Sequence, residues 1–190
     1  MLFATVLRTT PALLLAVSSA GLAAAGPASA EERTCRGTIG AVVLDNLRVP
    51  QGATCTLNGT RLQGTIKVER GGTLKASTVR VNGNVQAENA RSVTVLDSRV
   101  GGSIQLVQGG TANLRRNVVS ADILFDDNSG VLAGVNNTIG GNLQAFQNTG
   151  GVTIASNRID GNLQCKENSP RPTGGRNVVE GSKEDQCRGL

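Results

Sequence analysis

From residue 45 onward, hydrophobic and polar positions follow a pattern that recurs about every 19 or 20 residues, a period within the range of known repeat proteins. One unit reads GTIKVERGGTLKASTVRVN and the next reads GNVQAENARSVTVLDSRVG, with hydrophobic residues at matching places. The units begin at Asp45, Gly64, Gly83, Gly102, Ala121, Gly141 and Gly161. Such a short period is typical of a solenoid, in which each unit stacks on its neighbours. We therefore expect about seven stacked coils.

Within each unit, hydrophobic residues alternate with polar ones at a period of two. Ile66 and Val68 flank Lys67 in one short segment, and Leu74 and Ala76 repeat the pattern in the next. Such alternation is typical of a strand with one buried face. A third short segment ends at Val81, Val100, Val119, Ile139, Ile159 and Val179. Three short strands per unit predict an all-β parallel β-helix. The alternative, a leucine-rich repeat, would need a Leu spacing and a helical half that are missing.

Polar residues between the predicted strands indicate how the coils turn. Gly and Asn recur there, at places where we expect turns with positive φ. Asn117, Asn137, Asn157 and Asn177 each lie two residues before the last buried position of a unit. An inward Asn at a turn can bond the backbone and the Asn of the next coil. These four residues therefore predict a structural ladder.

The beginning of the chain, residues 1–30, has the pattern of a secretory signal peptide. Arg8 is the only charged residue in this segment, an apolar run follows it, and Ala28-Ser29-Ala30 fits the small-residue cleavage pattern. A membrane anchor is the alternative, which the short run rich in Ala and Ser disfavours. No later segment predicts a membrane span. We expect a mature chain that begins at Glu31 and is secreted, either extracellular or associated with the cell wall.

The four Cys residues lie where the ends of such a rod need protection, because end coils carry unpaired strand edges. Cys35 precedes Cys55 by about one coil, and Cys165 precedes Cys187 by about one coil. Other pairings would have to cross most of the rod, beyond the reach of a disulfide. We predict the disulfides Cys35–Cys55 and Cys165–Cys187, one at each end.

These patterns give a domain organisation. Residues 1–30 form the predicted signal peptide, 31–44 an N-terminal cap, 45–181 the β-helix and 182–190 a C-terminal cap. Because caps oppose end-to-end stacking, we expect a monomer.

Composition narrows the chemistry of the chain. It has no His, which excludes Ser-His-Asp and Cys-His catalysis and imidazole metal ligands. It also has no Trp or Tyr, so a strong aromatic platform for sugars or bases is missing, and we do not expect nucleic acid as a partner. Removal of residues 1–30 takes away one Arg, so 18 basic and 14 acidic side chains give a net charge of +4.

One column of basic residues follows successive coils. Arg61, Arg80 and Arg99 occupy the same place in three consecutive units. Arg115 and Arg116 follow in the next unit, and Arg158 returns to the column later. Stacked guanidiniums repel one another unless an anionic group lies along them. The column therefore predicts a stripe that binds an anionic polymer, such as a cell-wall polymer or acidic polysaccharide. The alternative is a solvated face neutralised by nearby carboxylates.

A second outward column is rich in amides. It contains Arg48, Lys67, Gln86, Gln105, Gln144 and Gln164, and Leu124 interrupts it. Amides in register can read sugar hydroxyls, which makes Gln86, Gln105, Gln144 and Gln164 candidate ligand-binding residues. They can equally bond to one another along the stack, and we favour this second interpretation.

A third column is acidic and raises the question of a metal ion. Glu69, Glu88 and Asp126 share it, but Val107 separates Glu88 from Asp126 by two coils, about 10 Å, which is too far for one ion. Asp122 and Asp127 lie nearby on the same coil as Asp126. We predict no metal, no cofactor and no catalytic residue, since all coils are of nearly equal length and no long loop forms a cleft.

The repeated GNLQ and N-x-[IV]-x-G steps resemble right-handed parallel β-helix proteins of the pectate-lyase-like group. The segments NLRVPQGATCTLNGT and GNLQCKENSPRPTGG, with EDQC near the end, are similar to small secreted proteins of actinobacteria. The resemblance covers nearly the whole mature chain and implies a right-handed β-helix outside the cell. It implies no reaction, because this fold carries lyases, hydrolases, adhesins and inert scaffolds.

Together these features favour a secreted structural or binding β-solenoid that contacts a polyanionic or glycan surface of the cell envelope. The alternative from another class is a small polysaccharide lyase or hydrolase of the pectate-lyase-like group. That alternative requires a concave groove with two or more carboxylates and a basic residue on adjacent coils.

Overall fold

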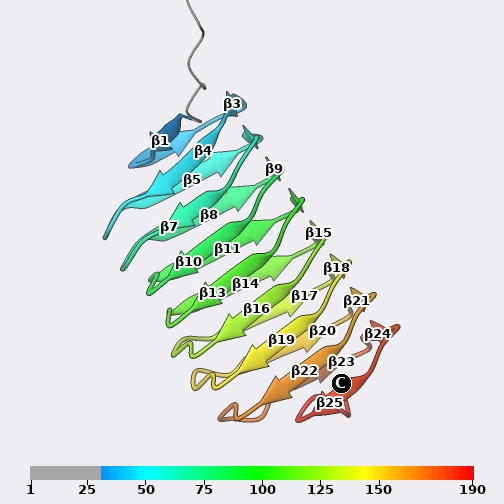
Figure 1. The fold of residues 1–190 in the computed structure, drawn as a ribbon. Helices are drawn as coiled ribbons and strands as arrows, with labels where there is room; N and C mark the ends of the chain where they lie inside the picture. The colour runs from blue at the N-terminus through cyan, green and yellow to red at the C-terminus, as the bar shows by residue number, and fades with distance from the viewer. Residues whose placement is uncertain (1–30) are drawn as a thin grey trace, which may run out of the picture.

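The computed structural model describes residues 31–190, so the predicted signal peptide lies outside the described residues. The described chain forms 25 strands and no helix, and the strands assemble into three parallel sheets. Sheet A has nine strands, and sheets B and C have eight each. The coils stack into a rod with its first coil at one end and its last at the other (Figure 1). The predicted all-β parallel β-helix is confirmed.

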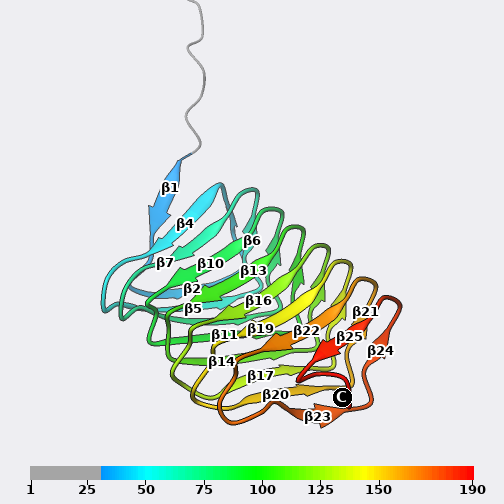
Figure 2. The ribbon, with the colours of Figure 1, turned by 60° about the horizontal axis from the view of Figure 1, so that its bottom comes forward.

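Each coil contributes one strand to each sheet. Sheet A contains β1 (Glu32–Thr34), β4 (Asn46–Val49), β7 (Ile66–Val68), β10 (Val85–Glu88), β13 (Ile104–Val107), β16 (Ile123–Asp126), β19 (Leu143–Phe146), β22 (Leu163–Lys166) and β25 (Lys183–Asp185). Sheet B contains β2 (Gly37–Ile39), β5 (Thr54–Asn58), β8 (Thr73–Ser77), β11 (Ser92–Leu96), β14 (Thr111–Arg115), β17 (Leu132–Val135), β20 (Val152–Ala155) and β23 (Thr173–Gly175). Sheet C contains β3 (Val43–Leu44), β6 (Arg61–Leu62), β9 (Arg80–Val81), β12 (Arg99–Val100), β15 (Val118–Val119), β18 (Thr138–Ile139), β21 (Arg158–Ile159) and β24 (Val178–Val179). Figure 2 shows the three faces that these sheets form around the axis.

The rod has about eight turns, one more than the sequence pattern indicates. Residues 31–44, expected as a cap, form β1, β2 and β3, which pair in register with β4, β5 and β6. All three residues of β1 are exposed, so this strand lacks the alternation of hydrophobic and polar residues that marks the other coils. At the other end, β25 pairs with β22 and begins a ninth turn.

The coils become one residue longer partway along the rod. In sheet A, Ile104 pairs with Ile123, whereas in sheet B Ala112 pairs with Leu132, which is a step longer by one residue. The additional residue therefore lies in the turn between β16 and β17, which contains Asn128. The insertion is absorbed at a corner, so the register of every sheet is kept.

The core is a narrow column of hydrophobic side chains that point inward from all three sheets. Leu47, Ile66, Val85 and Ile104 are successive members of one inward column of sheet A, and each has no exposed surface. Phe125 is the one aromatic residue in the core of the described chain. A Cβ added at Gly134 would lie 3.6 Å from the Phe125 ring. That distance is ordinary van der Waals contact, so the space beside the ring would also accept a methyl group.

The predicted Asn ladder is confirmed at the corner between sheets B and C. The side-chain oxygen of Asn137 accepts hydrogen bonds from the backbone nitrogen and Nδ2 of Asn117, at 3.0 and 3.1 Å. Nδ2 of Asn117 also donates to the carbonyl of Val95 at 2.8 Å. The same bonds recur through Asn157 to Asn177. Each buried amide thus satisfies polar groups of the coils before and after it.

Two further ladders, which the sequence reasoning missed, occupy the other two corners. Between sheets A and B, Asn128, Asn148 and Asn168 are buried and bond one another in the same way, and Gln186 ends the series. Between sheets C and A, side-chain oxygens accept backbone N–H bonds in a series of Asn46, Thr65, Asn84, Ser103, Asp122, Asn142 and Asn162. In the ladder between sheets A and B, Asn recurs once per coil, so its repeat is visible in the sequence. In the ladder between sheets C and A, Thr, Ser and Asp take the place of Asn on several coils, which conceals the repeat.

Left-handed corner positions are held by more than Gly and Asn. Between residues 31 and 190, twelve non-glycine residues have positive φ, among them Thr78, Asp97 and Arg116. Gly161 is needed for a different reason, which is the close approach of neighbouring coils. A Cβ at Gly161 would lie 2.6 Å from Oδ1 of Asn142 and 2.7 Å from the carbonyl oxygen of Gly141. Gly161 therefore makes room for the ladder between sheets C and A.

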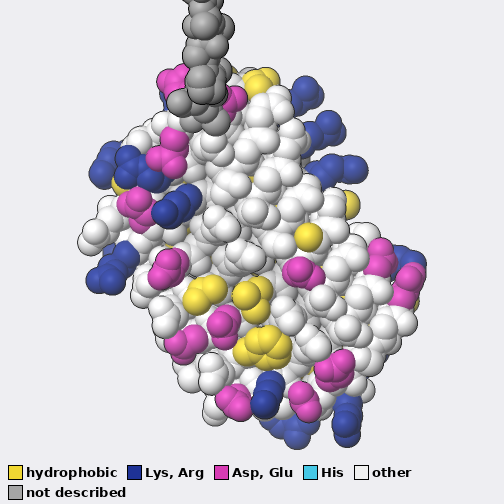
Figure 3. All heavy atoms as spheres, viewed as in Figure 1, with side chains coloured by type: hydrophobic (Ala, Val, Ile, Leu, Met, Phe, Trp, Pro, Cys, Tyr) yellow, Lys and Arg dark blue, Asp and Glu magenta, His cyan; other side chains and the backbone are white. Residues whose placement is uncertain are grey.

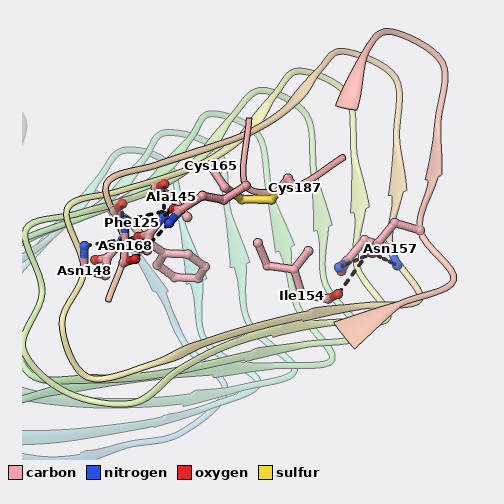
Figure 4. Close-up of a disulfide and its surroundings, with 10 residues drawn as sticks. Phe125, Ala145, Asn148, Ile154, Asn157, Cys165, Asn168 and Cys187 are labelled. Carbon is pink, nitrogen blue, oxygen red and sulfur yellow. Dashed lines mark hydrogen bonds between the residues drawn. A yellow bond between two sulfur atoms is a disulfide. The ribbon is translucent and has the colours of Figure 1, made fainter. Parts of the chain in front are cut away.

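Both predicted disulfides are confirmed. Cys35–Cys55 joins the first coil to the second, and Cys165–Cys187 joins β22 to the segment after β25. All four Cys residues are buried. Figure 4 shows the Cys165–Cys187 bond inside the last coil, with Asn148 and Asn168 of one ladder on one side and Asn157 of another on the opposite side. Each disulfide therefore fastens an end coil to its neighbour.

Candidate functional site

The three predicted arginines form a column on sheet C. Arg61 pairs with Arg80, and Arg80 pairs with Arg99, so their Cα atoms occupy equivalent places on three adjacent coils. Each is the first residue of a two-residue strand whose second residue is buried, which turns the guanidinium outward. Val43 and Val118 occupy the column on the coils before and after. We call Arg61, Arg80 and Arg99 the arginine column.

The arginine column carries uncompensated charge. Within residues 31–190, no carboxylate lies within ion-pair distance of these three guanidiniums. Basic side chains project in a row from the edge where β9 lies (Figure 3). Arg158 lies further along the same position of sheet C but pairs with Glu180 and with Asp160. Arg158 thus has the carboxylate partners that the alternative interpretation requires, and the arginine column has none within ion-pair distance.

A shallow hollow of about 420 Å³ lies on sheet A, and a second of about 370 Å³ lies beside the arginine column. All three members of the arginine column line the second one. Its other walls include Thr78, Ser98, Asp97 and Arg116, contributed by the corner between sheets B and C. The hollow therefore combines the column with a further pair of opposite charges.

Asp97 and Arg116 form a clamp at the margin of this hollow. Nε of Arg116 lies 2.5 Å from Oδ1 of Asp97, and one terminal nitrogen lies 2.8 Å from Oδ2. This is the two-pronged geometry in which arginine binds a carboxylate most strongly. The hydrogen bonds from Arg116, and then its charge, hold the pKa of Asp97 below the ordinary value. The sequence pattern singled out Arg116 but not its partner Asp97.

Arg115, the neighbour of Arg116, does not join this surface. It lies on β14 in sheet B, and its Nε donates to Oδ1 of Asn113 at 2.7 Å. Arg115 is the last residue of β14, whereas Arg116 lies at the corner with a positive φ, so the two side chains belong to different faces of the rod. Proximity in sequence therefore overstated the number of arginines at the site.

The amide column lies in register on sheet A, where Leu124 divides it into two parts, and neighbouring amides within each part bond each other. Nε2 of Gln86 donates to Gln105 at 3.3 Å, and Nε2 of Gln144 donates to Gln164 at 2.8 Å. Gln164 continues the series to Glu184 at 2.9 Å. Hydrogen bonds from Ser182 and Gln164 lower the pKa of Glu184. The self-bonded ladder, which was the favoured interpretation, is what the geometry displays.

At the start of the same column, charged side chains replace the amides. Arg48 forms ion pairs with Glu32 and Glu69, at 3.0 and 3.4 Å, and donates to the hydroxyl of Thr34. Lys67, Gln86, Gln105 and Glu88 line the hollow of about 420 Å³ on this face. A single carboxylate and a single lysine therefore line that depression.

The acidic residues are spaced as the sequence indicated. Val107 pairs with Glu88 on one side and Asp126 on the other, so it separates the two carboxylates. Asp122 belongs to the ladder between sheets C and A, where its Oδ1 accepts from the backbone nitrogen and Nδ2 of Asn142, at 2.7 and 3.1 Å. Asp127 accepts from Gln108. In the part of the chain that the structure describes, no three potential metal ligands come together.

Comparison of the chain with protein-family models, curated proteins and solved structures finds no match. The fold class therefore rests on the structure itself, which defines a disulfide-linked parallel β-solenoid. The resemblance to the pectate-lyase-like group and to actinobacterial proteins stays a prediction. Among residues 31–190 no helix is long and apolar enough to cross a bilayer.

Proposed function

We propose that the protein is a secreted binding solenoid that attaches to an anionic polymer of the cell envelope through the arginine column. The observation that carries this proposal is the in-register exposure of Arg61, Arg80 and Arg99 without carboxylate partners. Guanidiniums on neighbouring strands are held about 4.8 Å apart at their backbones. Their mutual repulsion is relieved when an anionic chain lies along the column.

The shape of the molecule supports a binding role over a catalytic one. From β4 onward the coils differ in length by a single residue and the first coil is shorter, so the described chain builds no long loop over either hollow. A polymer that follows the rod axis meets a surface that is rigid, because the backbone is paired on both sides of β6, β9 and β12. The fixed spacing of the arginine backbones lowers part of the entropic cost of binding.

Two features support the proposed location outside the cell. The disulfides are compatible with an oxidising compartment outside the cytosol. The signal-peptide pattern of residues 1–30 supports export, because such a segment directs a chain to the secretory pathway. We therefore place the ligand among the anionic polymers and polysaccharides that are accessible outside the cell.

Binding to immobilised wall teichoic acid at low ionic strength tests the proposal. The triple variant Arg61→Gln, Arg80→Gln, Arg99→Gln should lose most of the binding, and the affinity of the unaltered protein should fall as salt rises. The matched control is Arg171→Gln, Arg176→Gln, Arg188→Gln, which removes the same charge from exposed positions near the C-terminal end. Equal losses of binding in the two triple variants would mean that net charge, and not the arginine column, determines binding. Absence of binding by the unaltered protein in low salt would refute the proposal.

A further inference from the structure

The Asp97–Arg116 clamp lies where the arginine column stops. On the coil after Arg99, the column position is taken by Val118, which carries no charge. Arg116 lies two residues before Val118 and lines the same hollow as Arg61, Arg80 and Arg99. It is therefore the one residue of that coil that brings a fourth guanidinium to the site. Nε and one terminal nitrogen of Arg116 donate to the Asp97 carboxylate.

Asp97 is placed to affect a bound anion in two ways. Its carboxylate competes with a bound anion for Arg116, because it occupies the Nε edge of the guanidinium, one of the edges that can bind a phosphate with two bonds, and neutralises its charge. It also repels an anionic chain that continues past Arg99. Asp97 is the one carboxylate that lines this hollow in the described structure. Both effects act at the same end of the arginine column.

We propose that Asp97 is the specificity-determining residue of this surface: by holding Arg116, it restricts the site to the three cations of the arginine column. This inference rests on the proposed function. The site then accepts a short run of anionic groups that spans three coils, about 10 Å between the outer backbones. A densely and continuously charged chain gains nothing beyond Arg99, because it meets the clamp and Val118.

Release of Arg116 should add a fourth contact to a dense polyanion. The probe is linear inorganic polyphosphate, and the variant is Asp97→Asn, which keeps the shape of the side chain and removes its charge. We expect binding to tighten roughly three- to fivefold, the scale of one exposed ion pair. The logarithm of affinity should fall more steeply with the logarithm of salt concentration, by roughly 0.7–0.9, which corresponds to one more neutralised phosphate.

Two further variants separate the clamp from the overall charge. Asp160→Asn removes a carboxylate that also pairs with an exposed arginine, Arg158, at 3.7 Å but lies outside the hollow, so it is the matched control. The double variant Asp97→Asn, Arg116→Gln should return to within about twofold of the unaltered protein. A gain in Asp97→Asn no larger than in Asp160→Asn, or a gain that persists in the double variant, would overturn the role of the clamp.

Failure of the proposed function gives a different result. If the triple variant of the arginine column binds polyphosphate as well as the unaltered protein does, the column is not the site, whatever Asp97→Asn does. If the triple variant loses binding and Asp97→Asn behaves like Asp160→Asn, the column stands and the clamp has no part in specificity. Absence of binding by both the unaltered protein and Asp97→Asn refutes both.

Discussion

Oδ1 of Asn157 accepts two hydrogen bonds from Asn137, one from its backbone nitrogen at 2.9 Å and one from its Nδ2 at 3.1 Å. The Nδ2 group of Asn157 donates in turn to the carbonyl of Gly134, one coil back, at 2.8 Å. A single buried carboxamide thus satisfies polar groups on the preceding coil that water cannot reach. Since coils contact only their neighbours, such bonds determine how firmly one coil is attached to the next.

Replacement of this carboxamide should be costly. Asn157→Ala leaves the backbone N–H of Asn137 and the carbonyl of Gly134 without those partners, in a buried corner. An unsatisfied buried group costs about 1–3 kcal/mol, so we expect a loss of roughly 3 kcal/mol in the free energy of unfolding. Urea denaturation followed by circular dichroism measures this.

The control for that experiment is Asn82→Ala. Asn82 is exposed and bonds Gln63, so its replacement should change stability by less than about 0.5 kcal/mol. Equal effects of the two substitutions would mean that the ladder contributes no more than a surface amide.

Two glycine positions should respond in opposite directions to the same change. At Gly134 an added Cβ meets Phe125 and Leu143 at 3.6 and 3.7 Å, which is ordinary contact, so Gly134→Ala should be neutral or stabilise by up to about 1 kcal/mol. At Gly161 the added Cβ meets Asn142 and Gly141 at 2.6 and 2.7 Å, so Gly161→Ala should destabilise by roughly 1–3 kcal/mol. Thermal unfolding of the two variants compares them directly, and a destabilised Gly134→Ala would contradict the packing described.

Loss of either disulfide should loosen one end of the rod and leave its centre intact. The pairs are separated by 20 and 22 positions in the chain, for which a contribution of about 3 kcal/mol is typical. In Cys35→Ser, Cys55→Ser, amide hydrogen exchange should accelerate in β1–β3, while β11 and β14 keep their protection. In Cys165→Ser, Cys187→Ser, the acceleration should be confined to the last coil. Uniform acceleration along the chain in either variant would show that the rod unfolds as one unit.

The clamp makes a prediction about pH. Arg116 lowers the pKa of Asp97 from the ordinary value of 3.8, so the ion pair contributes to stability above that pH. The contribution is lost as the pH falls through the lowered folded value, since protonation then removes the charge. In Arg116→Gln, the pKa of Asp97 should rise toward 3.8, measured by NMR titration of its carboxyl carbon. An unchanged titration curve would show that the clamp is not formed in solution.

Regular repetition explains what the sequence predicted well. Because parallel coils stack in register, a residue type that recurs once per repeat must form a column, and this located Arg61, Arg80 and Arg99 as well as Asn117 and its successors. The disulfides followed from the same period. Alternation at a period of two likewise identified the inward positions.

The features that were missed depend on contacts that a repeat does not encode. The first coil has no alternating pattern, because all of β1 and the first two residues of β2 are exposed. The ladder between sheets C and A is built by side-chain oxygens of several residue types, so no single letter repeats. The pairing of Asp97 with Arg116 depends on side chains that meet at a corner between two coils. Such a contact arises once and leaves no periodic trace.

The parallel register of the sheets also gives the molecule the properties of a ruler. Equivalent residues on adjacent coils, such as Arg61, Arg80 and Arg99, are separated by one strand spacing, about 4.8 Å. A residue inserted at a corner, as between β16 and β17, leaves this spacing unchanged. Evolution or design can therefore add whole coils to the rod, or move a charged residue from one coil to another by single substitutions. The spacing between neighbouring positions stays the same in either case.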